Sequence, residues 1–270
     1  MRHFSHVFLC AVFFLVIGTS AFATDKKVYT FGVVPQQSPT QLAKVWIPIT
    51  KYLSKKTGYK FRFVTAKNIP DFEKELEKGA YDFAYMNPYH YVVYHSKPGY
   101  DAFAHARDKK IKGIIIVHKD SSYQTLNDLY ESELAFPSPL AFAATLLPSA
   151  ELKALNIKHT RKYVGSHDSV YRNVALGKVS AGGGVMRTFK AVSKEVSGEL
   201  RILYTTDGYT PHAFAASPAV PKEVVDDVQN VMVNMERDSE GKKYISRLKI
   251  IGIEIATDAD WNDVRKLKLK

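Results

Sequence analysis

The chain has 270 residues, of which 46% are hydrophobic and 24% are charged, so it is long enough for one large globular domain or two smaller ones. This balance excludes a disordered chain, and a formal net charge of +11 indicates a clearly positive surface. The lysines are dispersed in pairs and do not form one stripe with interleaved aromatic residues, so the charge favours small anions or solubility over nucleic acid.

Residues 1–23 have the pattern of a secretory signal peptide. Arg2 lies in a short basic start, residues 7–18 are almost wholly apolar, and residues 21–23 read Ala-Phe-Ala, a small-x-small cleavage site. The apolar run is too short to span a membrane comfortably. The single cysteine, Cys10, lies inside this segment. We therefore expect cleavage after Ala23 and a mature chain without disulfides, a cysteine nucleophile or a cysteine-ligated metal.

The first half of the mature chain alternates predicted strands and helices. Thr40 is the expected cap of the first helix and Gly58 its stop. The order strand, helix, strand, helix, strand predicts a parallel sheet, in which ligands lie at the carboxyl ends of strands. The loops after Val34 and Tyr85 are therefore the first places to look for a site. The predicted elements cover residues 27–34, 40–58, 59–66, 71–78 and 81–85.

The second half repeats this pattern and ends in a helix over residues 222–235. Residues 207–216 are expected to be irregular. Two long extended segments join the two α/β blocks, which predicts two lobes with a cleft between them. We expect the first lobe at residues 24–115 with 208–270 and the second at 116–207. The predicted elements of the second half are strands over residues 112–119, 161–164, 179–181 and 200–205, and helices over 121–129, 141–155 and 170–177.

Residues 135–148, read Ala-Phe-Pro-Ser-Pro-Leu-Ala-Phe-Ala-Ala-Thr-Leu-Leu-Pro, combine a strand end, a tight turn and a helix start. Pro137 and Pro139 force extended backbone on the residues before them, and the small residues that follow let a helix begin with several unpaired amides. These amides and the helix dipole favour a negatively charged ligand group. Taken alone, the stretch equally suits a buried helix with an apolar first turn, and that interpretation is the simpler one.

Three further patterns have competing interpretations. His167 and Asp168 would suit a catalytic pair, but the chain has no Gly-x-Ser-x-Gly elbow, which favours a ligand donor beside a helix-capping aspartate. His90 and His95 do not have the spacing of two metal ligands on one helix face and are interpreted as surface residues. The glycine run at 182–184 has no adjacent P-loop lysine, which favours close packing or a cleft wall.

Five stretches of the chain form a recognisable set, namely residues 31–35, 46–48, 81–85 with Pro88 and Tyr89, 165–168, and the junction ending in Leu147 and Pro148. Together they resemble the periplasmic substrate-binding proteins of phosphate, phosphite and phosphonate ABC transporters. They occur in the family's order and cover most of the mature chain. The resemblance implies a two-lobed α/β fold of the type II periplasmic binding protein class, with two hinge-crossing segments and an interlobe cleft. It also implies a monomeric, non-enzymatic protein of the periplasm that needs no cofactor or metal.

In this family the ligand lies between the lobes, held by the helix start of the second lobe and by aromatic and polar residues of the first. Tyr91 and Tyr94 are assigned to the core instead. We add Arg187 and His212 to the expected site because they follow the glycine run and a Thr-Pro pair, although Arg187 equally suits the surface of a helix. The positions that match the family are Pro35, Gln36, Tyr85, Asn87, Tyr89, Ala141, Phe142, Ala143, Thr145 and His167.

The chain departs from the family at residues 140–144, where relatives have a run rich in serine and threonine. Each lost hydroxyl removes a charge-assisted hydrogen bond worth about 1.5 to 3 kcal/mol. His167, Arg187 and His212 are expected to compensate. They are bases where binders of aminophosphonates are expected to offer acids. We therefore expect a small anion without an amine, with an apolar or sulfur-containing body against Phe142 and the cleft tyrosines.

The resulting hypothesis is a solute-binding protein that closes by hinge bending around a small anion and delivers it to an ABC permease. An alternative is a sensory protein that presents its closed form to a membrane histidine kinase or chemoreceptor. A third, enzymatic alternative is a hydrolase that uses His167 and Asp168.

Overall fold

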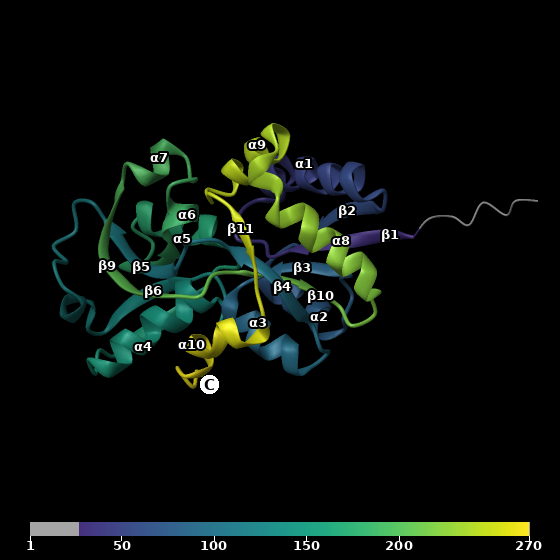
Figure 1. The fold of residues 1–270 in the computed structure, drawn as a ribbon. Coiled ribbons are helices and arrows are strands. Elements are labelled where there is room, and N and C mark those ends of the chain that lie inside the picture. The colour runs from purple at the N-terminus through teal and green to yellow at the C-terminus, as the bar shows by residue number, and fades with distance from the viewer. Residues whose placement is uncertain (1–26, 270) are drawn as a thin grey trace, which may run out of the picture.

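The computed structural model describes residues 27–269, which form two lobes side by side, each with its own sheet (Figure 1). The predicted signal peptide at residues 1–23 lies outside the described residues. Within the described part, none of the helices has the length and apolar character needed to cross a membrane.

The first lobe is built on a six-stranded sheet of order β11-β4-β10-β3-β1-β2. β1 is parallel to both β2 and β3, as the alternation of strands and helices predicts. β10 inserts antiparallel between β3 and β4, so the chain returns to this lobe near its end. The strands are β1 (Val28–Val33), β2 (Lys60–Thr65), β3 (Phe83–Met86), β4 (Asp101–Ala106), β10 (Ala213–Ala216) and β11 (Ile253–Ile255).

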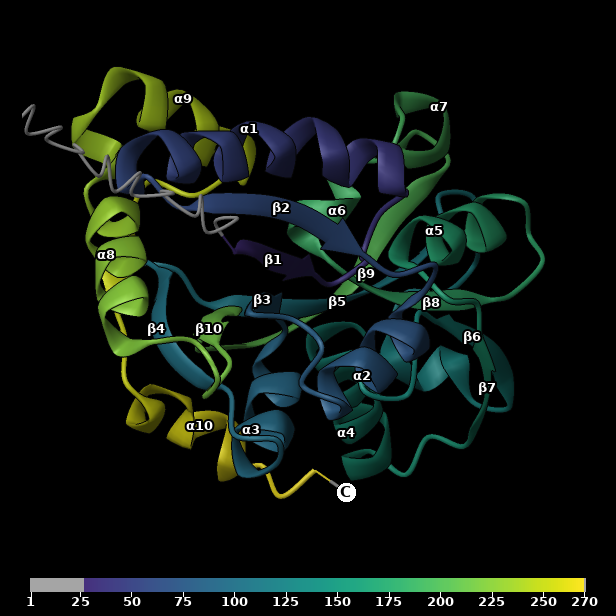
Figure 2. The same cartoon turned by 90° about the vertical axis from the view of Figure 1, so that its right-hand side faces the viewer.

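Helices cover both faces of this sheet. In Figure 2, α1 and α9 lie above the strands, and α2, α3 and α10 lie below them. α1 begins at Pro39 and not at the predicted cap Thr40, because the Ser38 hydroxyl accepts from the amide of Gln41 and Pro39 takes the first helical position. The helices are α1 (Pro39–Thr57), α2 (Ile69–Glu77), α3 (Pro88–Ser96), α8 (Lys222–Val233), α9 (Ser239–Arg247) and α10 (Asn262–Arg265).

The second lobe is built on a five-stranded sheet of order β7-β6-β8-β5-β9. β6 is parallel to β7 and β8, whereas β5 runs antiparallel to β8 and β9. The strands are β5 (Ile111–His118), β6 (Ser132–Phe136), β7 (His159–Tyr163), β8 (Ala181–Val185) and β9 (Leu200–Tyr209). The longer helical elements are the π-helix η2 (Phe142–Leu146), α4 (Leu147–Ala154) and α5 (His167–Ala175), with the short α6 (Met186–Phe189) and α7 (Lys194–Ser197).

Two short segments, residues 107–110 and 210–212, connect the two sheets. They lie next to each other because β5 and β9 pair up to Ile111 and Tyr209, the residues that adjoin the two crossings. The predicted irregular stretch at 207–216 is therefore wrong in part, since β9 continues to Tyr209 and β10 follows at Ala213–Ala216.

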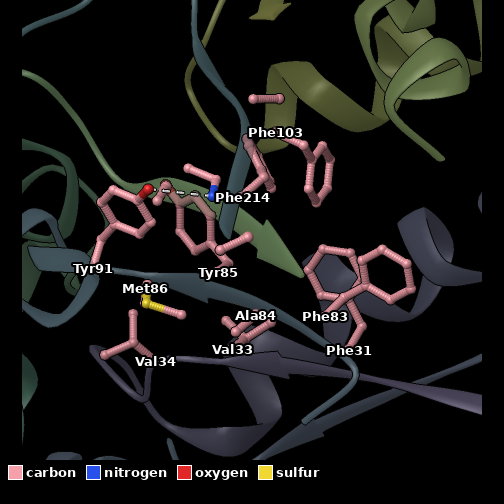
Figure 3. Close-up of a cluster of buried hydrophobic side chains, with 14 of the residues drawn as sticks. Phe31, Val33, Val34, Phe83, Ala84, Tyr85, Met86, Tyr91, Phe103 and Phe214 are labelled. Atoms are coloured by element: carbon pink, nitrogen blue, oxygen red, sulfur yellow. Dashed lines mark hydrogen bonds between the residues drawn. The ribbon is translucent and has the colours of Figure 1, made fainter. Parts of the chain in front are cut away.

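A cluster of buried aromatic side chains holds the centre of the first lobe (Figure 3). Phe31 and Phe83 stack with ring centroids 6.0 Å apart. Tyr85 packs between Trp46 and Phe214, with both centroid distances at 4.9 Å. Buried aromatic rings are large and rigid, so they hold the end of β3 in place beside the second lobe. The assignment of Tyr91 and Tyr94 to the core is confirmed, since both are buried.

Candidate ligand-binding site

Residues from both lobes and from one crossing meet where the two sheets face each other. The loop after β1 provides Gln36, and the N-cap of α3 provides Asn87. The second lobe provides the junction at residues 140–145, the first residue of α5 and the start of α6. His212 lies in the crossing that leads into β10. These segments lie at the carboxyl ends of parallel strands or next to them, where open α/β sheets place their ligands.

The helix at the junction begins as a π-helix, which the sequence did not predict. The amides of Thr145 and Leu146 both donate to the carbonyl of Ala141, at 2.7 and 3.2 Å, and α4 follows without a break. Within residues 27–269, the amides of Phe142, Ala143 and Ala144 have no hydrogen-bond partner. A helix start with free amides attracts anions, and π-turns are frequent at functional sites.

Glycines in the neighbouring strands let this helix start lie directly on the second sheet. A Cβ on Gly183 would be 1.8 Å from the carbonyl oxygen of Ala144, and a Cβ on Gly113 would be 2.1 Å from that of Ala143. Both distances are far below any real contact, so only glycine allows the backbones to approach. The close-packing interpretation of the glycine run at 182–184 is confirmed.

A chain of hydrogen bonds crosses from one lobe to the other and fixes the protonation of His167. A guanidinium only donates, so the bond from Arg187 Nη2 identifies the oxygen of the Gln36 amide. The amide nitrogen of Gln36 then faces His167 Nε2 at 3.5 Å, which makes Nε2 the acceptor. Nδ1 carries the proton and faces Thr188 Oγ1 at 3.2 Å. Burial, with a smaller effect of the Arg187 charge, lowers the pKa of His167 to about 3, so the ring is neutral.

His212 offers a polar atom that the protein does not use. Its ring stacks on Tyr85, with centroids 4.9 Å apart and an angle of 18° between the planes. Among the described residues, its buried Nε2 has no hydrogen-bond partner. Burial, followed by the Arg187 charge, lowers the pKa of His212 well below its usual value. The neutral ring can therefore donate one hydrogen bond to a ligand without carrying a charge into the interior.

Two adjoining cavities lie between the lobes. The larger has a volume of about 300 Å³ and lies against the crossing segments. The smaller, at about 10 Å³, has room for roughly one water molecule and lies against the junction. Both are lined by Ile111, Val185 and His212, so they share a wall.

Most of the residues expected at the site line one of these cavities. Tyr85 and Arg187 line the larger cavity, and His212 lines both. The surface interpretation of Arg187 is thus not supported. Besides His212, the smaller cavity is lined by six further expected residues, namely Gln36, Asn87, Ala141, Phe142, Ala143 and His167.

Three expected site residues line neither cavity. The hydroxyl of Tyr89 donates to the carbonyl of Leu269 at 2.6 Å, which holds it to the C-terminal segment. The hydroxyl of Thr145 donates to the carbonyl of Ser138 at 2.8 Å, so it stabilises the turn before the helix. Pro35 is buried beside β1.

Two predictions about polar residues are wrong. Asp168 does not cap α5, because the Ser166 hydroxyl accepts from the amide of Ser169 and takes that position. Asp168 instead accepts from the amide of Ser38 in the other lobe, at 3.2 Å. His90 is not a surface residue but is fully buried, and its Nε2 lies 2.9 Å from a carboxylate oxygen of Glu73. His90 lies in the first turn of α3 (Pro88–Ser96), a helix that the sequence analysis did not include, and this helix turns the ring inward.

Lysines in the first crossing and at the start of β5 line a cavity, and the sequence analysis did not find them. Lys109, Lys110 and Lys112 line the larger cavity. The only sequence signal for these lysines was their position near the expected crossing between lobes, and the pair at 109–110 looked like other dispersed surface pairs.

Elsewhere in the described part, His118, Asp120 and Glu199 lie close enough to share a metal ion, but Glu199 already pairs with Lys119 at 3.1 Å.

Comparison with known proteins identifies the family. Residues 31–261 match the model of the family described as ABC transporter, phosphonate, periplasmic substrate-binding protein. The phosphate-import protein PhnD of Mycolicibacterium smegmatis is 22% identical over an alignment of 280 residues, gaps included, and the alignment covers 87% of this chain and 83% of that protein.

Two solved structures share the fold. PhnD1 from Prochlorococcus marinus, in complex with methylphosphonate, superposes with a TM-score of 0.81 at 18% identity, over 90% of this chain and 98% of that one. A binding protein component of an ABC phosphonate transporter from Pseudomonas aeruginosa also gives 0.81, at 17% identity, over 90% of this chain and 86% of that one. The two-lobed type II fold expected from the sequence is confirmed, and the chain belongs to the family of periplasmic substrate-binding proteins of phosphonate ABC transporters.

Proposed function

We propose that the protein binds a small oxyanion of the phosphonate and phosphate class between its lobes and delivers it to an ABC permease. The observation that carries this proposal is the set of free amides at Phe142, Ala143 and Ala144 beside the unpartnered Nε2 of His212. These are neutral donors from two different elements, and neutral donors suit a ligand that brings its own negative charge.

The lining of the cavities supports an anion and argues against an amine. Among residues 27–269, no aspartate or glutamate lines either cavity between the lobes. An ammonium group of a ligand would have no counter-charge there, and the positive charge of Arg187 would repel it. Residues 140–144 carry no serine or threonine hydroxyl, but the backbone amides remain, and each donates one directed hydrogen bond.

Ligand entry requires the lobes to separate. The smaller cavity holds about one water molecule, which is too little for a tetrahedral oxyanion. Hydrogen bonds that join the lobes include the one from Asn87 Nδ2 to the carbonyl of Leu140, at 3.1 Å, and the one from the Ser38 amide to Asp168. We infer that hinge motion at residues 107–110 and 210–212 breaks these bonds and admits the ligand.

A hydrolase function is not favoured. The Asp168 carboxylate bonds to the amide of Ser38 and has no hydrogen bond to His167. His167 Nε2 already accepts from Gln36, so neither residue is poised to activate a nucleophile.

Isothermal titration calorimetry of the mature protein with methylphosphonate, phosphate, phosphite and 2-aminoethylphosphonate tests this function. We expect binding of at least one amine-free oxyanion and much weaker binding of the amine. His212→Phe keeps the stacked ring but removes Nε2, and should lower the affinity at least about tenfold. His159→Phe, on β7 at the edge of the second sheet, is the matched control. If none of the oxyanions binds, the proposed function is wrong. If His212→Phe and His159→Phe have the same affinity, the proposed role of His212 is wrong.

A further inference from the structure

The larger of the two cavities adjoins the candidate oxyanion site and forms a separate compartment. Its volume of about 300 Å³ lies within the range of small-molecule pockets, and it adjoins the smaller cavity at Ile111, Val185 and His212. A ligand whose head lies at the junction can therefore extend into it past the His212 ring.

Much of the lining of this compartment is apolar. Ile114, Met186, Pro211 and Ile250 line it together with the shared Ile111 and Val185. Such walls suit a short hydrocarbon stem, because the apolar surfaces of both the stem and the walls are removed from water when the stem enters.

The charged groups at this compartment are all positive. Arg187 and Lys109 line it, both are half-buried, and in the described part neither has a carboxylate within 4.0 Å. Lys110 has one, with Asp263 at 3.6 Å. Burial, and to a smaller extent the Arg187 charge, lowers the pKa of Lys109, since both disfavour the charged ammonium. Two like charges held together without a counter-charge are costly, and a ligand anion removes that cost.

On this geometry we propose that the ligand carries a second acidic group, joined to its oxyanion head by a short apolar stem and bound by Lys109 and Arg187. The proposal rests on the proposed function, because the head of the ligand occupies the site described there. A carboxylate suits the distal position, since a guanidinium and an ammonium can each donate to it. The ligand class is thus a phosphono- or phospho-carboxylate with a short apolar stem.

Four compounds separate the contributions of head, stem and distal group. Methylphosphonate has only the head, propylphosphonate adds the stem, 3-phosphonopropanoate adds the acid and 2-aminoethylphosphonate adds an amine. Calorimetry should show 3-phosphonopropanoate binding at least about tenfold more tightly than propylphosphonate, and the amine binding most weakly. Equal affinities of 3-phosphonopropanoate and propylphosphonate would overturn the proposal while the proposed function stands. Failure of all four, and of phosphate and phosphite, would overturn the proposed function itself.

Lys109→Met tests the distal contact directly. It should weaken 3-phosphonopropanoate at least about tenfold and leave methylphosphonate within about twofold. Lys190→Met, at the exposed end of α6, removes the same charge away from the cavity lining and should change neither affinity. Lys109 also donates to the carbonyl of Lys249 at 2.6 Å, so thermal unfolding of both variants is measured first. Equal loss of both compounds in Lys109→Met would show a general charge or structural effect and contradict the proposal.

Discussion

Arg187 donates a hydrogen bond to the side-chain oxygen of Gln36, and the two residues come from different lobes. The bond turns the amide nitrogen of Gln36 towards His167, so one contact sets both the amide orientation and the histidine tautomer. Arg187 also lines the larger cavity. Gln36 therefore links the closing of the lobes to the arrangement of donors at the site.

Gln36→Glu should convert this link into an ion pair and oppose anion binding. A carboxylate at this position pairs with Arg187 and adds a negative charge beside the smaller cavity. Because like charges repel strongly at partly buried sites, the affinity for an oxyanion should fall at least about tenfold. Calorimetry checks this, with Gln37→Glu as a control that adds the same charge one residue away. Equal affinities in the two variants would contradict the prediction.

Gly183→Ala should displace the junction helix. The new Cβ would meet the carbonyl oxygen of Ala144 at 1.8 Å, and backbone cannot yield as a flexible side chain does. Overpacking of this kind costs about 1 to 3 kcal/mol or more of unfolding free energy, and it should also weaken anion binding because the free amides move. Urea unfolding and calorimetry measure the two effects.

Gly58→Ala is the control for Gly183→Ala, because it replaces a glycine away from the junction. No atom lies within 4 Å of a Cβ at Gly58, but its φ of +77° is unfavourable for alanine. It should lose about 1 to 2 kcal/mol of stability and keep its affinity. Unchanged affinity in Gly183→Ala would show that the junction amides do not contact the ligand.

Phe142→Ala should lower the stability of the protein strongly, because the Phe142 ring is packed in the core. The side chain is 1% exposed, and its ring meets that of Tyr209 edge to face at 5.7 Å. Removing a buried phenylalanine costs about 3 to 5 kcal/mol of unfolding free energy. Urea unfolding measures this loss, and Phe61→Ala on the half-exposed β2 should lose clearly less. Equal losses would mean that Phe142 is not packed as described.

Acid should destabilise the protein through His167. Burial lowers its folded-state pKa to about 3, whereas an unfolded histidine titrates near 6.5. Between these values the unfolded chain binds a proton that the folded chain does not, so stability is lost as the pH falls from 6.5 towards 3. The slope is at most about 1.4 kcal/mol per pH unit for this group.

Urea unfolding at pH 7, 6, 5 and 4 measures that slope. In His167→Gln the loss of stability over this range should be smaller than in the unaltered protein, because the group that binds the proton is gone. Parallel curves for the two proteins would show that His167 does not control the acid response.

The fold was predictable because its signals are local. The alternation of strands and helices up to residue 86 follows from hydrophobic periodicity and from stops such as Gly58, whose backbone is left-handed in the structure. Caps were less predictable, since Ser38 and Thr40 are both able to cap a helix and only Pro39 at the first position decides between them. The short strand β10 was missed because four residues of Ala-Phe-Ala-Ala have no distinctive pattern of their own.

The sequence by itself determined the family, the order of most elements and the loops at which a ligand would be held. Only the tertiary structure decided which side chains meet there. Tyr89 matches the family motif but is held by Leu269, whereas Lys109 matches no motif and lines the cavity. The reason is physical: such contacts join residues up to 180 positions apart in the chain. Their geometry depends on how two complete lobes pack, and no local pattern of residues encodes it.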